Sequence, residues 1–453
     1  MHKHFHITMS TTQIIMFSFF FTIIIGSILL SLPISSANGQ SVPYLDALFT
    51  ATTSTCVTGL VTLPVVSTWS TFGQVIILIL IQIGGLGIVT IMSGLMLSFH
   101  KKMGLKDKIL LQDAFNLNSL SGLINFTKKV ILGTFVIESL GALIYMTVFI
   151  PEYGMKGIWI SIFTSISAFC NAGIDIISEN SLCDYTLNST INVVTSLLII
   201  IGGIGYIVWW DIIRVLKNIK KLRFKIFKNL TLHSKIVLSV TILLIVAGTM
   251  SVFAFEYYNP LTIGSYSFFD KIKVAFFQSV TTRTAGFAMI PQQNLTNASA
   301  IVCLLLMFIG GSPVGTAGGI KTVTFAILIA SMLSTVKNKT DISLFNRNIP
   351  PNLIRKAVAV VSMSFIIMFI STLLLASTTD ACALDIAYET ISATATVGLT
   401  RNLTPTLNIF GKIIIIVTMF LGRIGPISLA VAFSTKKQTK NIIKNPTEEI
   451  IVG

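Results

Sequence analysis

Eight long apolar stretches are the feature that most constrains how this chain of 453 residues can fold. A helix needs about 20 apolar residues to cross the hydrocarbon core of a bilayer, and these stretches are of that order. Only 11% of the residues are charged, whereas soluble proteins carry about 25%. We therefore expect an integral membrane protein rather than a soluble one. The stretches are residues 14–32, 72–97, 130–150, 191–210, 236–255, 301–334, 357–376 and 409–433.

Four shorter and less apolar segments lie between these stretches, at residues 46–56, 160–170, 272–282 and 385–395. They are too short to cross a bilayer and too apolar to be ordinary loops. Non-helical backbone at membrane depth is tolerated only where protein covers it or water lines it. The pattern therefore predicts four re-entrant segments.

The net charge of +15 comes from 32 Lys and Arg against 17 Asp and Glu. Most of these cations fall in alternate connections, within residues 101–129, 214–235 and 337–356, and in the two terminal segments. Cytoplasmic loops of membrane proteins collect Lys and Arg in this way. The pattern predicts eight spans with both termini in the cytoplasm, and it excludes a nucleic-acid partner, which would require one exposed basic face.

The chain also repeats itself, because four glycines stand 112 to 114 residues apart, one in each outward connection. The glycine loops are Cys56-Val57-Thr58-Gly59-Leu60, Cys170-Asn171-Ala172-Gly173-Ile174, Arg283-Thr284-Ala285-Gly286-Phe287 and Ala395-Thr396-Val397-Gly398-Leu399. An aromatic residue precedes each glycine by ten positions, and Asp46 and Asp385 are expected to cap two of the short helices. The repeat boundaries are 1–104, 105–218, 219–340 and 341–434, followed by a cytoplasmic tail at 435–453.

The chemistry that requires such loops is cation selection by backbone carbonyls, which replace the hydration shell of a potassium ion. Glycine permits the backbone angles that turn successive carbonyls toward one axis. A short helix ending at such a loop directs the negative end of its dipole toward a cation. We therefore predict that K⁺ is held by carbonyls, and that no side-chain metal site is needed. The filter residues are Val57, Thr58, Gly59, Asn171, Ala172, Gly173, Thr284, Ala285, Gly286, Thr396, Val397 and Gly398.

The second apolar stretch of the third repeat contains five glycines and Pro313 between residues 310 and 319. Glycine and proline cost a helix about 1 and 3 kcal/mol each, so an unbroken helix is not expected here. We predict an irregular loop that lines the pore below the filter and obstructs it, although a kinked packing helix is the alternative. The gate residues are Gly310, Gly311, Ser312, Pro313, Gly315, Thr316, Gly318, Gly319, Lys321 and Arg423.

Arg423 stands inside the last apolar stretch, where a buried cation is a functional candidate. It is expected either to form an electrostatic barrier below the filter or to hold the gate loop through carbonyl contacts. The alternative is a packing ion pair with Glu138, an acidic residue within the third apolar stretch.

With these motifs, and with the stretch from Gly310 to Lys321, the sequence resembles the membrane subunit of the Trk, Ktr and HKT potassium transporters, and the bacterial Ktr type most of all. The resemblance implies an all-α membrane fold, with four units of two helices and a pore loop in pseudo-four-fold arrangement around one pore. It implies K⁺ uptake across the bacterial plasma membrane, coupled to or activated by Na⁺. It also implies a homodimer seated on a cytosolic regulatory ring, so that any nucleotide is bound by the partner and no cofactor by this chain.

Each loop has one filter glycine, so discrimination among K⁺, Rb⁺ and Na⁺ is expected to be weaker than in an ordinary potassium channel. The sequence contains no nucleophile–base constellation, and we expect no enzymatic activity. Residues 106–125, 214–235 and 434–453 are the expected docking surface for the cytosolic partner. An alternating-access cation carrier remains the alternative function, although carriers usually show two inverted halves.

Overall fold

The structure is a computed structural model that describes residues 10–87, 90–94, 104–114, 122–218, 226–339 and 341–425. The described chain is almost entirely helical. Its one sheet is a small antiparallel hairpin in which strand β1 (Ser343–Leu344) pairs with β2 (Arg347–Asn348). Lys3 and the tail after residue 425 lie outside the described residues. So do residues 95–103, 115–121 and 219–225, which belong to the predicted basic connections and docking surface.

Four helices of the described part are long and apolar enough to cross a membrane on their own. They are α1 (Thr11–Ser31), α7 (Leu123–Tyr153), α13 (Leu232–Glu256) and α17 (Pro351–Ala376). Between 17% and 39% of the residues in their most apolar windows are buried inside the protein. Large apolar side chains on these helices are exposed, as at Leu132, Ile242 and Phe365, which fits contact with lipid.

A shorter helix follows each long one and packs against it. The four are α2 (Tyr44–Cys56), α8 (Lys156–Cys170), α14 (Phe268–Thr281) and α18 (Ala383–Ala395). Their aromatic residues enter the core, since Phe49, Phe163 and Tyr388 are fully buried. With 13 to 15 residues each, these helices are too short to cross a bilayer.

A second apolar helix then follows each short one: α4 (Thr71–Leu86), α9 (Ser189–Gly203), α15 (Asn297–Phe308) and α19 (Ile409–Ile424). Each begins at a residue whose side-chain oxygen accepts a hydrogen bond from a backbone N–H of the first turn. These N-caps are Ser70, Asn188, Thr296 and Asn408. The sequence therefore determines locally where all four helices start.

Each of these second helices ends before its apolar stretch does, which the sequence predicted only for the third. After α4, α9 and α19 the chain turns at Gly87, Gly205 and Gly425, whose φ angles are 83°, 88° and 87°, a region that other residues avoid. Helices α9 and α10 (Tyr206–Lys217) meet at 99°. The third stretch is interrupted between α15 and α16 (Thr322–Val336). The break in the third stretch was predicted, whereas the ends of α4, α9 and α19 within their stretches were not, and the number of crossings remains a prediction.

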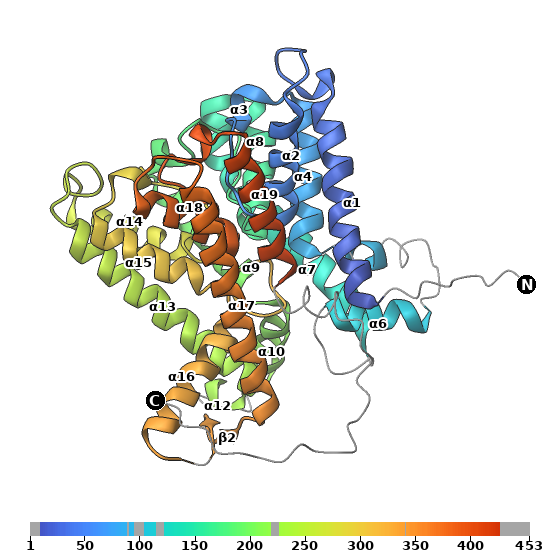
Figure 1. Cartoon of the computed structure of the whole chain (residues 1–453), viewed down its shortest axis with the longest axis vertical. Coiled ribbons are helices and arrows are strands. Elements are labelled where there is room, and N and C mark those ends of the chain that lie inside the picture. The colour runs from blue at the N-terminus through green and yellow to red at the C-terminus, as the bar shows by residue number, and fades with distance from the viewer. Residues whose placement is uncertain are drawn as a thin grey trace, which may run out of the picture.

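The helix groups contact one another in a closed order. Helix α4 packs on α8, α9 on α14, α15 on α18, and α19 returns to α2. Figure 1 shows α1, α2 and α4 side by side, with α19 beside them in red although it is the last helix described. The first and last helix groups are thus neighbours in space.

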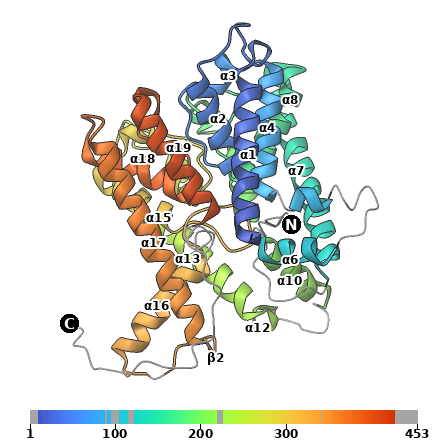
Figure 2. The same ribbon diagram turned by 45° about the vertical axis from the view of Figure 1, so that its right-hand side comes forward.

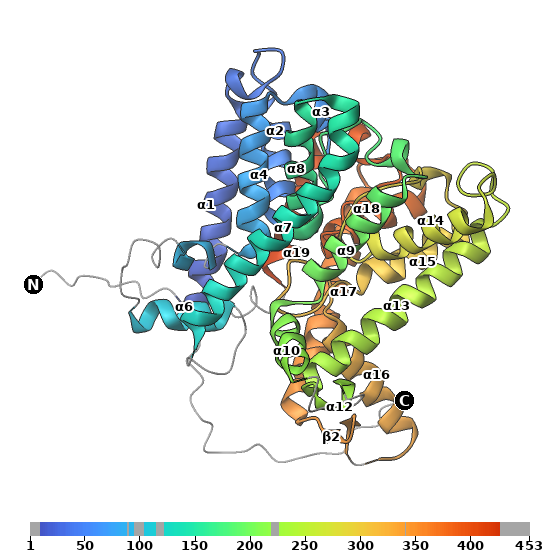
Figure 3. The same cartoon turned by 180° about the vertical axis from the view of Figure 1, so that it is seen from behind.

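Helices α10, α12 (Ile226–Asn229) and α16 gather with β2 at one end of the protein, as Figures 1 and 3 agree. The ring of Phe227 lies 5.9 Å from that of Phe345 and joins α12 to the hairpin. Figure 2 shows α16 and α17 extending together toward the same end. The remaining helices are α3 (Val65–Thr68), α6 (Leu105–Ala114) and four 3₁₀ turns at Pro33–Ser35, Cys183–Tyr185, Gln292–Asn294 and Thr404–Thr406.

Candidate functional site

The four glycine loops share one unusual backbone conformation. In each loop a residue other than glycine has a positive φ angle, and the glycine two positions later does as well. Such residues are uncommon in proteins and mark functional or constrained positions. The residues are Val57, Asn171, Thr284 and Thr396, with φ from 51° to 62°, and Gly59, Gly173, Gly286 and Gly398, with φ from 64° to 103°.

Hydroxyl groups of the short helices hold these loops in place. Thr53 Oγ1 accepts a hydrogen bond from the N–H of Gly59 at 2.9 Å, and Ser392 Oγ accepts one from Gly398 at 3.0 Å. In the other two loops, Ser167 Oγ bonds the N–H and the carbonyl of Ile174, and Thr281 donates to the carbonyl of Phe287 at 2.6 Å. The sequence analysis missed these four hydroxyls. In three of the loops the signal was present, as a Ser or Thr six residues before the glycine.

The four loops meet in a closed ring. A Cβ atom added to Gly59 would lie 2.6 Å from the carbonyl oxygen of Ala172, in the second loop. One on Gly173 would lie 2.5 Å from the oxygen of Ala285, in the third. In the same way, a Cβ atom added to Gly286 would collide with Val397 O, and one added to Gly398 would collide with Thr58 O. Each glycine therefore touches the carbonyl that precedes the next glycine, and no side chain fits between neighbouring loops.

Asp46 and Asp385 do not cap the short helices, so that expectation was wrong. The N-cap positions are Pro43 and Cys382, and neither makes a side-chain cap hydrogen bond. Asp46 instead pairs with Lys412 of α19 at 2.5 Å, and Asp385 pairs with Arg401 at 2.6 Å. The first of these ion pairs joins the first helix group to the last.

Residues 309–321 form an irregular loop at the predicted break, bound to the bend between α9 and α10. The N–H of Ser312 donates to Gly203 O at 2.9 Å, and that of Thr316 to Gly202 O at 3.2 Å. The N–H of Tyr206 donates in return to Val314 O at 2.9 Å. The break in the third apolar stretch and the bend in the second therefore form one hydrogen-bonded unit.

The same loop also reaches the short helices and the glycine loops. Thr316 Oγ1 donates to Phe169 O of α8 at 3.1 Å, and the N–H of Gly318 donates to Thr284 Oγ1 at 3.1 Å. Ser312 and Thr316 are fully buried. The irregular loop thus contacts the end of α8 before the second glycine loop and the third glycine loop, and a Cβ atom added to Gly318 would also meet Ala395 O and Thr396 Oγ1 of the fourth.

Two cationic side chains bind carbonyl groups at this loop. Lys321 Nζ donates to Ala317 O at 2.6 Å, and Arg423 Nη1 donates to Thr316 O at 2.7 Å. Arg423 also donates to Gly84 O of α4. Glu138 takes part in none of the ion pairs found among the described residues. The alternative of an ion pair between Glu138 and Arg423 is therefore wrong.

Arg283 is a third cation that binds this loop, and the sequence analysis placed it in an outward connection. Its side chain donates to Thr241 O of α13 at 3.2 Å and to Gly310 O at 3.4 Å. Only 6% of its surface is exposed. A signal was available, because Arg283 comes three residues before the glycine, where the first two loops have Cys56 and Cys170.

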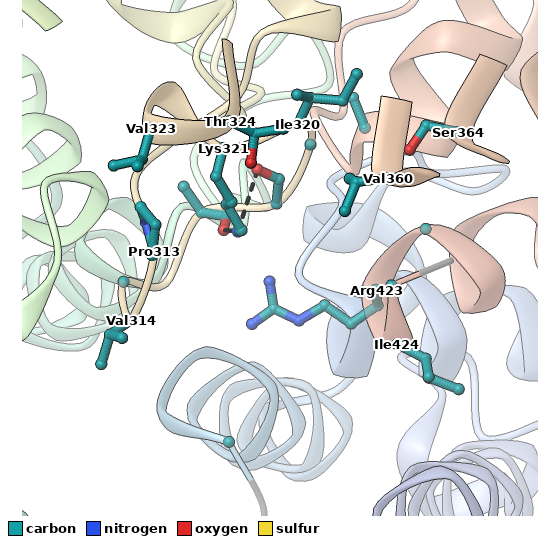
Figure 4. A pocket seen from close by; sticks show the side chains of 18 of the residues that line it. Pro313, Val314, Ile320, Lys321, Val323, Thr324, Val360, Ser364, Arg423 and Ile424 are labelled. Atoms are coloured by element: carbon teal, nitrogen blue, oxygen red, sulfur yellow. Dashed lines mark hydrogen bonds between the residues drawn. The ribbon is translucent and has the colours of Figure 1, made fainter. Parts of the chain in front are cut away.

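A cavity of about 650 Å³ lies beside the irregular loop. Lys321, Lys356 and Arg423 line it, and no Asp or Glu is among its lining residues. Figure 4 shows Arg423 extending from the end of α19 into the space that faces Lys321 and Pro313. Among the described residues, no three His, Cys, Asp or Glu side chains lie close enough to hold a metal ion.

Long apolar helices surrounding a ring of backbone carbonyls define a multi-pass membrane protein whose site is built from main chain rather than from catalytic side chains. The chain belongs to the TrkH family of cation transport proteins, whose sequence model matches residues 2–444. Cation transport is not an enzymatic class.

Relatives and a solved structure agree with this membership. The chain is 40% identical to the Ktr system potassium uptake protein B of Bacillus subtilis over 442 residues, which cover 97% of this chain and 96% of the relative. It is 39% identical to the potassium/sodium uptake protein NtpJ of Enterococcus hirae, over 98% of both chains. The crystal structure of the potassium transporter TrkH from Vibrio parahaemolyticus matches with a TM-score of 0.72 at 15% identity, over 96% of this chain and 87% of that one, which supports the fold.

Proposed function

We propose that this chain carries K⁺ into the cell through a filter formed by its four glycine loops. The observation that carries the proposal is the ring in which each glycine touches the carbonyl before the next glycine. Carbonyl oxygens gathered at one place can replace the water around a dehydrated K⁺. The names of the relatives in Bacillus subtilis and Enterococcus hirae, both uptake proteins for potassium, support the same cargo.

The pore proposal includes a pseudo-four-fold arrangement of four units, with eight crossings and cytoplasmic termini. Helices α2, α8 and α18 end directly before a residue with positive φ, so their carbonyl ends face the loops. The negative end of a helix dipole favours a cation there. An alternating-access carrier remains the alternative, but the closed order of contacts through all four units favours a single central pathway.

Expression in cells that lack their own potassium uptake systems tests the proposal. We expect the chain, together with a cytosolic ring subunit, to restore growth at low external K⁺. Growth that depends on K⁺ equally with and without the chain would contradict a role in potassium uptake.

We further propose that residues 310–321 form the gate. This loop lies beside the second, third and fourth glycine loops, and three cationic side chains hold its carbonyls. A positive charge in a low-dielectric site repels a cation more strongly than it does in water. Lys321 and Arg423 therefore serve as an electrostatic barrier while they hold the loop across the pathway.

Replacement of Arg423 by Gln is expected to raise K⁺ flux in the absence of the ring subunit by about tenfold, because hydrogen bonds from a charged group contribute about 1.5–3 kcal/mol each. The substitution removes the contacts with Thr316 O and Gly84 O. Tracer uptake at equal membrane abundance measures the effect.

Two further variants define this experiment. Arg423→Lys retains the charge and is expected to show a smaller increase. Lys339→Gln, an exposed residue after α16, is the control and leaves the flux unchanged. If Arg423→Gln keeps flux low and dependent on the ring, the proposed role of Arg423 is wrong.

We propose that a cytosolic ring subunit docks at the end of the protein where α10, α12 and the hairpin gather. Exposed or partly exposed basic residues cluster there, including Arg214, Lys228, Lys235, Arg347 and Arg355. The Phe227–Phe345 contact brings the second and third basic connections together. The designation of two relatives as parts of a Ktr system supports a multi-component assembly. We propose in addition that the protein forms a homodimer and that its K⁺ uptake is coupled to or activated by Na⁺.

A further inference from the structure

Glu138 is an acidic residue near the centre of the long helix α7, and only 4% of its surface is exposed. A carboxylate at membrane depth is costly, and such residues face the protein interior and mark functional sites. The ion pairs among the described residues do not include it. Its burial therefore needs an explanation other than a salt bridge.

The carboxylate is held by polar groups from two other helices. Gln82 Nε2 of α4 donates to Glu138 Oε2 at 3.1 Å. The thiol of Cys170, at the end of α8, lies 3.8 Å from Glu138 Oε1 and 3.4 Å from Gln82 Oε1. The three side chains thus form a buried polar cluster that joins α4, α7 and α8, and we call it the Glu138 cluster.

The cluster lies directly behind the glycine loops. Cys170 immediately precedes Asn171, the residue of the second loop with a positive φ angle. A Cβ atom added to Gly85 would lie 2.6 Å from Cys170 Sγ, so the end of α4 packs closely on this thiol. The orientation of the second loop therefore depends on where Cys170 is held.

The equivalent place in the third unit shows that helix packing alone does not require a carboxylate. Ser165 of α8 donates to the backbone carbonyl of Glu138 at 2.6 Å. In the same way, Ser279 of α14 donates to the backbone carbonyl of Ile245 at 2.9 Å. The backbone contact is the same, but α13 has an apolar side chain at this point.

We propose that Glu138 is a specificity-determining residue that positions the second glycine loop through Cys170. The proposal rests on the function of the loops as a filter. A loop held in one orientation keeps its carbonyl oxygens where they can replace the water around a dehydrated cation. Glu138 is thus a positioning residue that acts on the ion through the loop.

Kinetics of Rb⁺ or K⁺ uptake test this role. Glu138→Gln keeps the size of the side chain but replaces the carboxyl group by an amide, which presents an N–H group to a neighbouring donor. We expect the KM for K⁺ to rise about tenfold, as for a buried polar group left without its hydrogen-bond partner, with maximal rate and membrane abundance unchanged. Cys170→Ala is expected to raise the KM in the same direction, and Cys170→Ser, which keeps a donor, to restore it.

Glu152→Gln is the matched control, because Glu152 lies on the same helix at its exposed end and accepts a hydrogen bond from Tyr185. We expect it to leave the KM unchanged. A wild-type KM in both Glu138→Gln and Cys170→Ala overturns the proposal. A lower abundance with an unchanged KM assigns Glu138 to packing only and also overturns it.

Gly173→Ser separates this inference from the proposal on which it rests. If Gly173→Ser leaves the KM and the preference for K⁺ over Na⁺ unchanged, the filter proposal fails. If Gly173→Ser raises the KM while Glu138→Gln and Cys170→Ala do not, only the role of Glu138 fails.

Discussion

Replacement of Gly59 by Ser is expected to lower the affinity for K⁺ by tenfold or more and to reduce the preference for K⁺ over Na⁺. Gly59 has a φ angle of 103°, and an added Cβ atom would lie 2.6 Å from Ala172 O. A residue forced into such a conformation costs about 1–3 kcal/mol, and relief requires that the second loop move. Uptake kinetics for K⁺ and Na⁺ at matched abundance measure both effects.

Gly39→Ser is the control for backbone strain alone. Gly39 also has a positive φ angle, 68°, but nothing lies within 4 Å of an added Cβ atom, and the residue is exposed. We expect it to leave affinity and preference unchanged. Gly286→Ser, which would press on Val397 O, should behave like Gly59→Ser. An unchanged K⁺ preference in both filter variants would disprove the filter assignment.

Deletion of residues 311–318 is expected to raise K⁺ flux in the absence of the ring subunit by an order of magnitude or more. It removes the contacts of Ser312, Thr316 and Gly318 with α9, α8 and the third glycine loop, each worth about 1 kcal/mol. The gap can close with little movement, because a Cβ atom added to Gly310 would lie 2.9 Å from Gly319 Cα. Tracer uptake with and without the ring measures the change.

A milder variant covers the case in which the deletion disturbs folding. Thr316→Val removes the hydrogen bond to Phe169 O and is expected to raise flux by a smaller factor. Thr316→Ser keeps the hydroxyl and is its control. If both the deletion and Thr316→Val retain low, ring-dependent flux, the gate lies elsewhere.

The positions of the glycine loops could be predicted because the requirement for glycine is local. A positive φ angle at Gly59 or Gly398 is a property of one residue, and three nearly equal spacings made the pattern visible. The ring that these residues form depends on contacts between loops more than a hundred positions apart. The sequence suggested such a ring only through the repeat.

The supporting hydroxyls could not be recognised in the same way. A Ser or Thr in a helix commonly bonds a carbonyl of the preceding turn, and the sequence does not show whether Thr53 or Ser392 reaches forward to the loop instead. Three of them nevertheless occur at a constant distance from the glycine, which a comparison between repeats would reveal.

The bend between α9 and α10 was missed for a different reason. The stretch around Gly203 and Gly205 is otherwise apolar, so its composition predicts a continuous span. The turn becomes possible because Gly205 adopts a φ angle of 88°, and it is held by hydrogen bonds from residues 312–316. Those partners belong to a different repeat, so no local pattern contains them.

The sequence predicted some contacts of the charged residues correctly and others wrongly. The structure contains the predicted contact between Arg423 and a carbonyl of the loop, but it contains no ion pair between Arg423 and Glu138. Arg283 was assigned to an outward connection because it lies close to a glycine loop, and burial cannot be recognised from that position alone.

The most direct measurement is Rb⁺ flux into liposomes that contain the purified chain lacking residues 311–318, with K⁺ or Na⁺ as competitor. This variant separates selection by the glycine loops from control by the gate. A carbonyl filter predicts that K⁺ inhibits the Rb⁺ flux at a concentration well below that of Na⁺, and that Gly59→Ser removes the difference. Equal inhibition by K⁺ and Na⁺ in the chain with intact glycines would contradict the account.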